Sequence, residues 1–177
     1  THNFDGNVSL TGTGALEINA PNLNNAIVTL NGNLSAHDIF TSEGSSSTAS
    51  VIVNGVTNIA DTIQATQGDV NIVNLNSLGG DVSIGSFSIL TLNNPGNSIA
   101  LNNLSFTGRG DFISGADVTV SGNFNAVFGG SGSAAINLTP GRQFILNGAS
   151  NINVTTTVGD FQLQGGELVN NSTLTWA

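Results

Sequence analysis

GGDVSIGS, at residues 79–86, is the stretch that decides the fold, because variants of it return along the chain. A small residue, an aspartate and alternating aliphatic or aromatic residues recur in GDVNI (68–72), GDFIS (110–114), ADVTV (116–120) and GDFQL (159–163). Alternation at period two is typical of a β-strand with one buried face. Each copy therefore predicts a short strand that begins directly after a turn.

Alternating apolar pairs of this kind continue through most of the chain, and helical periodicity is nearly absent. The chain is therefore predicted to be all-β. The pairs are Val70/Ile72, Val82/Ile84, Leu90/Leu92, Ile99/Leu101, Leu104/Phe106, Val118/Val120, Phe124/Ala126, Ile136/Leu138, Phe144/Leu146, Ile152/Val154, Phe161/Leu163 and Leu174/Trp176.

Two architectures accommodate many short strands: a β-sandwich and a solenoid. A sandwich needs hairpin turns, and only Asn31-Gly32, Asn54-Gly55 and Asn147-Gly148 have that form. Three of the predicted strands make a unit of roughly 24 residues, a period at which repeats stack as solenoids. We therefore predict a parallel β-helix of about seven turns and about 35 Å, with a β-sandwich as the alternative.

The whole chain, 1–177, is predicted to form a single β-helical segment. TSEGSSSTAS at 41–50 breaks the alternating pattern, so we expect a loop there that projects from the rod. The chain has no initiating Met and no signal peptide, which suggests a processed piece of a larger secreted protein. Cysteine is absent, so disulfides and thiolate metal sites are excluded.

The charge content is low and acidic, with a net charge of −9 and 7% charged residues. Lys is absent, and the only Arg residues are Arg109 and Arg142. Nucleic acids and anionic membrane surfaces need clustered cations, so neither is an expected partner. No apolar run approaches 18 residues, so no membrane insertion is expected. The 26 Asn residues favour turns and stacked amides over helices.

Longer stretches resemble a known family. THNFDGNVSLTGTGALEINAPNL (1–23), LTLNNPGNSIALNNLSFTG (90–108) and SGNFNAVF (121–128) are similar to the degenerate repeats of bacterial large exoproteins, the filamentous-haemagglutinin-like proteins and autotransporter passengers. The resemblance implies a right-handed parallel β-helix that serves as the shaft of a secreted or surface adhesin. It implies no residue-level functional site.

The recurring aspartates are the candidate metal ligands, since stacked carboxylates could bind Ca²⁺ through six to eight oxygens. The alternative is a local bond from each carboxylate to backbone N–H groups of its own turn, and we favour it. FGGSGSAAI (128–136) has the glycines of a nonapeptide Ca²⁺ repeat without its aspartate. No cofactor is therefore predicted, and the weak Ca²⁺ candidates are Asp69, Asp81, Asp111, Asp117 and Asp160.

Three other groups of residues are weaker candidates for a catalytic or binding site. His37-Asp38 is the only His beside a carboxylate and could form a general base, but no nucleophile motif accompanies it. Arg109 and Asp111 could belong to a polysaccharide-cleaving groove, and a local ion pair is the simpler interpretation. GGSGS (129–133) lacks the Lys and the helix of a phosphate loop. We therefore predict no catalytic residues and no enzyme activity.

Aromatic residues are expected mainly in the core. Trp176 could stack on a sugar, but a last strand whose ring packs in the core or covers the end of the rod is the favoured interpretation. TxT pairs, which ice-binding faces repeat on consecutive turns, occur at Thr11/Thr13, Thr155/Thr157 and Thr173/Thr175 without that regularity. The Phe residues expected to stack inside the coil are Phe87, Phe106, Phe112, Phe124, Phe128, Phe144 and Phe161.

The sequence therefore predicts an extracellular or cell-surface structural and adhesive segment, whose partners are host or neighbouring-cell surfaces and their glycans. A self-assembling extracellular filament or matrix subunit is the first alternative. A carbohydrate-binding or carbohydrate-active β-helix is the second. An active enzyme of that kind would need at least three acidic or basic side chains within about 8 Å.

Overall fold

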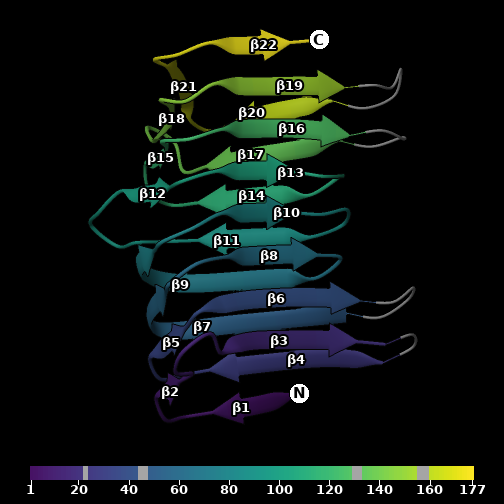
Figure 1. Ribbon diagram of the computed structural model, residues 1–177, viewed down its shortest axis with the longest axis vertical. Coiled ribbons are helices and arrows are strands. Elements are labelled where there is room, and N and C mark those ends of the chain that lie inside the picture. Colours follow the sequence, from purple (N-terminus) through teal and green to yellow (C-terminus); the bar gives the residue numbers. More distant parts are fainter. Residues whose placement is uncertain (22–23, 44–47, 129–132, 155–159) are drawn as a thin grey trace.

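The computed structural model describes residues 1–177 except 22–23, 44–47, 129–132 and 155–159. The described residues contain strands and no helix, and the strands stack as a β-solenoid of about seven turns. The two termini lie at opposite ends of the stack (Figure 1). Every strand pairing among the described residues is parallel, which confirms the parallel β-helix and excludes the sandwich.

Each coil, meaning one full turn of the solenoid, passes through three faces in the same order. The first face runs the length of the stack, and neighbouring strands on it are hydrogen-bonded. Its strands are β1 (His2–Phe4), β4 (Asn25–Leu30), β7 (Thr48–Ile59), β9 (Asp69–Leu78), β11 (Ile89–Leu92), β14 (Asp111–Ser114), β17 (Ala134–Leu138) and β20 (Phe161–Gln164).

The second face also runs the whole length and closes each coil. Its strands are β3 (Ala15–Ala20), β6 (Asp38–Glu43), β8 (Ile63–Thr66), β10 (Val82–Ile84), β13 (Leu104–Phe106), β16 (Phe124–Phe128), β19 (Ser150–Val154) and β22 (Leu174–Trp176).

The third face lies between the other two along the chain. At the amino-terminal end it is built by β2 (Val8–Ser9) and β5 (Leu34–Ala36) and by the second halves of β7 and β9. Towards the carboxyl terminus it becomes a separate sheet. That sheet consists of β12 (Ile99–Leu101), β15 (Val118–Val120), β18 (Gln143–Leu146) and β21 (Glu167–Asn170).

The core consists of columns in which each inward side chain packs on its equivalent one coil away. Val51, Val70, Leu90, Phe112 and Ile136 form one such column on the first face and are all fully buried. The alternating pairs predicted from the sequence supply these columns, since parallel in-register pairing keeps each apolar side on the same face. Only Val154 and the last pairs, Phe161/Leu163 and Leu174/Trp176, are incompletely buried, and they lie near the carboxyl-terminal end of the stack.

The Asn-Gly pairs that suggested hairpins lie at stacked corners instead. Asn31 donates its Nδ2–H to Asp5 Oδ1 and accepts a bond from Asn54 Nδ2, each at 2.8 Å. A Cβ atom on Gly32 or Gly55 would overlap the backbone of the corresponding corner one coil away. Glycine is therefore required there because successive backbones approach closely, rather than because the chain reverses.

The loop expected at 41–50 is wrong in its bounds. Strand β6 continues to Glu43, and β7 begins at Thr48. Thr41 and Ala49 are buried in the core, so both ends of the stretch belong to the solenoid. Residues 44–47 lie outside the described residues. The expectation of short strands is also wrong at two places, since β7 has 12 residues and β9 has 10.

The predicted aromatic core is largely confirmed, with one clear error. Phe106, Phe112, Phe124 and Phe144 are fully buried. Phe161 is half-buried, and its ring lies 5.7 Å from that of Phe124. Phe87 is the error, since it lies on the surface with 62% of its area exposed. The side chain of Phe128 lies outside the described part of the chain.

Candidate functional site

The five candidate Ca²⁺ ligands do not converge. Asp69 and Asp111 are the first residues of first-face strands, and Asp160 precedes one. Asp81 precedes a second-face strand and Asp117 a third-face strand. Asp69 and Asp111 share a column, but Ile89 occupies the coil between them. The described aspartates are therefore spread over three corners rather than stacked at one.

These carboxylates bond mostly across coils rather than within their own turn. Asp69 Oδ1 accepts the Ile89 N–H at 2.9 Å, and Asp117 Oδ1 accepts the Gln143 N–H at 2.9 Å. Asp81 Oδ1 accepts the side-chain amide N–H groups of Asn102 and Asn103. Asp160 alone has a local partner, the Gln162 side chain at 3.4 Å. The favoured interpretation, a bond from each carboxylate within its own turn, is therefore wrong for Asp69, Asp81 and Asp117. Their bonds link one coil to the next.

A different group comes together at one corner: His37, Asp38 and Asp61. One ligand atom from each lies within 4.8 Å of the others, the only such group of three or more among the described residues. His37 Nδ1 lies 2.8 Å from Asp38 Oδ2, and Asp38 Oδ1 accepts the Thr62 N–H at 2.9 Å. Asp61 is exposed one coil further on. The 24 residues between His37 and Asp61 equal the predicted coil length, and that spacing could have identified the group.

The chemistry open to this group is limited by the bonds it already makes. One nitrogen and several carboxylate oxygens could ligate a divalent ion, but both oxygens of Asp38 are engaged by neighbours. The group meets the requirement of three acidic or basic side chains within about 8 Å. The bonds that both Asp38 oxygens make to neighbours fit a corner hydrogen-bond network.

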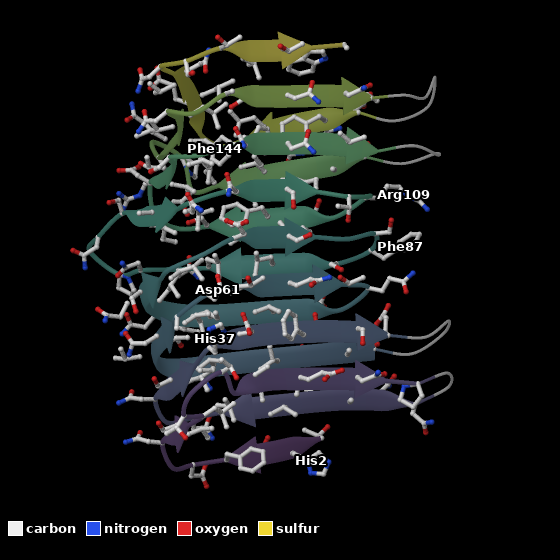
Figure 2. All side chains as sticks on the ribbon, viewed as in Figure 1. His2, His37, Asp61, Phe87, Arg109 and Phe144 are labelled. Carbon is white, nitrogen blue, oxygen red and sulfur yellow. The ribbon has the colours of Figure 1, made fainter. Side chains whose placement is uncertain are left out.

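Phe87 and Arg109 form a second candidate site on another edge of the rod, where Figure 2 shows them one above the other and His37 and Asp61 away from that edge. The Arg109 guanidinium lies over the Phe87 ring, 4.3 Å from the ring centroid. Phe87 has a φ of 62°, a left-handed conformation that costs a non-glycine residue about 1–3 kcal/mol. Strained backbone conformations cluster at functional sites, so this exposed aromatic residue beneath a cation is a candidate for one.

The backbone around this pair is tightly packed. The Phe87 N–H donates to the Arg109 carbonyl, so the two loops are bonded directly. Gly108 and Gly110 flank Arg109, and a Cβ atom on either would overlap atoms of the preceding coil at Ser86 and at Gly85. The site is therefore held in place by its backbone.

The pair borders a hollow of about 380 Å³, which we call the Phe87 hollow. Its lining residues are Phe87, Ser88, Ile89, Arg109, Gly110, Asp111 and Ser133. Burial raises the pKa of Asp111, partly opposed by a hydrogen bond from the Ala135 N–H. Asp111 thus lines the hollow. It does not form the expected ion pair with Arg109, because the Arg109 guanidinium lies over Phe87. No carboxylate of the described residues lies within 4.0 Å of that guanidinium.

The sequence indicated half of this site. Arg109 and Asp111 were candidates, while Phe87 was expected to stack inside the coil with the other Phe residues. Arg109 follows Phe87 by 22 residues, close to one coil, so the spacing could have paired them. The left-handed φ that turns the Phe87 ring outward could not be predicted from the residues next to it in the sequence.

The second face presents a column of outward, mostly polar side chains. From Gln64 onwards the column is uncharged: Gln64, Ser83, Ser105, Asn125, Asn151 and Thr175. Asn151 Nδ2 donates to Asn125 Oδ1 at 3.2 Å, so part of the column is an amide ladder. A hollow of about 480 Å³ opens on it, lined by residues that include Asn123, Asn125 and Asn151.

Trp176 and the TxT pairs do not form a regular binding face. Trp176 lies in the last strand, 62% exposed, and lines an apolar hollow at that end of the stack together with Phe124 and Phe144. Thr175 pairs with Asn151 rather than with another Thr, so the TxT spacing is not repeated on the neighbouring coil. Thr155 and Thr157 lie outside the described residues.

Comparison of the chain with protein-family models, curated proteins and solved structures finds no match. The similarity to filamentous-haemagglutinin-like exoproteins therefore stays a prediction, while the β-solenoid stands on the structure itself. The described residues contain no helix of sufficient length and apolar character to cross a membrane.

Proposed function

We propose that this chain is a structural and adhesive segment of a secreted or cell-surface bacterial protein. The observation that carries the proposal is the uncharged polar column of the second face, which continues through successive coils of a stacked core. Such a face can make repeated hydrogen bonds to a polar surface while the solenoid keeps them in register. The sequence resemblance to exoprotein shafts supports the same role.

The charge distribution supports attachment through hydrogen bonds rather than through ion pairing. Of the two arginines, Arg142 lies 3.9 Å from Asp117, and Arg109 lies over Phe87. A chain with a net charge of −9 and so few cations has little electrostatic attraction for anionic surfaces. Neutral glycans and the amide-rich surfaces of other proteins are better matched to this chemistry.

Self-assembly into a filament is the second candidate, favoured by the apolar side chains at the two ends of the stack. Phe4 and Trp176 are 49% and 62% exposed, and each lines an apolar hollow. A further coil stacked on either end, from the same polypeptide or another copy, would bury these side chains. Sedimentation of the purified chain separates the two cases, since a filament subunit polymerises.

The attachment role is tested by coating inert beads with the purified chain and counting those retained on a panel of host and bacterial cell layers. We expect retention above that of beads coated with an unrelated acidic protein of equal size. Competition by soluble chain should remove the difference. Retention equal to the control on every cell layer would contradict the proposal.

A further inference from the structure

We propose that the Phe87 hollow binds a neutral saccharide, with the Phe87 ring as the stacking surface and Arg109 and Asp111 as the hydrogen-bonding groups. This inference rests on the proposed attachment role and names a ligand class for it. The site lies on a different edge of the rod from the polar column of the second face. It therefore adds a localised contact to an otherwise repetitive surface.

The charges that line the hollow select the ligand class. The Arg109 guanidinium only donates hydrogen bonds, and the ionised Asp111 carboxylate only accepts them. A hydroxyl group both donates and accepts, so neighbouring hydroxyls of one sugar satisfy both residues. A carboxylate or sulfate would be repelled by Asp111, and an ammonium group by Arg109. Ser88 and Ser133 add uncharged polar lining.

The aromatic side chain supplies the apolar part of the contact. Phe87 is 62% exposed although Arg109 lies over its ring, so much of the ring remains accessible. The C–H groups of a pyranose form an apolar face of matching size, and hollows of about 300–1,000 Å³ accommodate small ligands. Ile89, 41% exposed, extends the apolar surface beside the ring.

The site is organised before the ligand arrives. Phe87 has a left-handed backbone, its N–H is bonded to the Arg109 carbonyl, and the glycines that flank Arg109 allow no side-chain atoms between these two coils. The strain is retained at an exposed residue where glycine would relieve it. A ring held in this way loses little conformational entropy on binding.

The test uses the intact chain on an immobilised panel of neutral glucans, galactans and mannans, with polyuronates and sulfated glycans as charged comparisons. Wild type is expected to bind at least one neutral polymer in preference to the charged ones. Phe87→Gly should weaken that binding at least about tenfold, as for loss of a central aromatic contact, while unfolding at the same or a higher denaturant concentration. Arg109→Gln should weaken it as well.

Matched controls separate the site from general surface effects. Trp176→Ala removes an equally exposed aromatic ring, and Arg142→Gln removes the other arginine, so both should bind like wild type. Preference for charged glycans, absence of binding to every neutral polymer, or unchanged binding by Phe87→Gly would each overturn the proposal.

Beads coated with the same variants distinguish this proposal from the attachment role. If wild-type and Phe87→Gly beads are retained equally on cells, the saccharide site is wrong and the attachment role stands. If wild-type beads are not retained while binding to a neutral polymer still depends on Phe87, the attachment role fails and the saccharide site stands.

Discussion

The amino-terminal coils (1–78) and the carboxyl-terminal coils (79–177) form the same three faces in different ways. In the first region, β7 and β9 each continue around a corner, so one strand serves two faces. In the second, β11 and β12 are separate strands joined by residues 93–98, and the third face is its own sheet. The two coils that contain β7 and β9 are thus closed by a bent strand, whereas the first two coils and the carboxyl-terminal coils have a turn between separate strands.

The buried core residues of the two regions also differ. The four fully buried Phe residues all lie in the carboxyl-terminal coils: Phe106, Phe112, Phe124 and Phe144. Phe124 of the second face meets Phe144 of the third and Phe161 of the first, with ring centroids 5.4 and 5.7 Å apart. The buried hydrophobic residues of the first region are aliphatic. The separate third sheet therefore lies over a core that contains large rings, and the bent strands lie over an aliphatic core.

The largest expected effect is the loss of the ring shared by the three faces. Phe124→Ala should lower the free energy of unfolding by about 3–5 kcal/mol, because it opens a cavity and removes contacts to three other rings. Ile72→Ala, at a fully buried position of the amino-terminal coils, should cost less. Denaturant unfolding of both variants measures the difference, and an equal or greater cost at Ile72 would contradict the proposed contrast.

The tight corners of the amino-terminal coils give the next effect. Gly55→Ala should cost about 1–3 kcal/mol, because its Cβ would overlap the Gly32 carbonyl. Gly6 belongs to the same corner column, but a Cβ atom there would meet no other atom within 4 Å, so Gly6→Ala should stay within about 0.5 kcal/mol of wild type. Thermal unfolding of the pair tests whether stacking, rather than glycine flexibility, accounts for the requirement.

The amide bonds at these corners are expected to contribute less. Asn31→Ala removes bonds to Asp5 and Asn54 and should cost about 0.5–1.5 kcal/mol. Asn97 lies at the wider 93–98 corner, where its side chain makes one long bond of 3.4 Å to Asn94. Asn97→Ala should therefore change stability by less than Asn31→Ala does. A reversed order in denaturant unfolding would show that the Asn ladder is not what stabilises the tight corner.

The smallest effect concerns the pH dependence of stability. Burial raises the pKa of Asp69, partly opposed by the bond from the Ile89 N–H. The folded chain then binds this proton more tightly than the unfolded chain, so stability falls as pH rises from the ordinary aspartate pKa through the raised one. Asp69→Asn, whose Oδ1 can still accept that N–H, should be more stable than wild type at about pH 7 and equal to it at about pH 3. A greater stability of wild type at neutral pH would contradict this sign.

The sequence was sufficient for the fold class because apolar alternation fixes which side chains point inward in every strand. It could not distinguish the Asn54-Gly55 corner from a hairpin, since that choice depends on which distant strand pairs next. It also placed Phe87 in the core, because the left-handed backbone that exposes the ring belongs to a corner of the coil, where Gln67 one coil earlier has it too, and not to the apolar alternation. The His37 and Asp61 pairing likewise becomes visible only when the coil length is applied to polar residues.

The most direct test of the central claim is to locate and size the native product with an antibody against this chain on fractionated source cells and medium. An adhesive shaft segment predicts a product in the surface or secreted fraction at a mass far above the 17.9 kDa of this chain. A product confined to the cell interior would contradict the claim. A band near 17.9 kDa that sediments as a polymer would also contradict it and would establish a filament subunit instead.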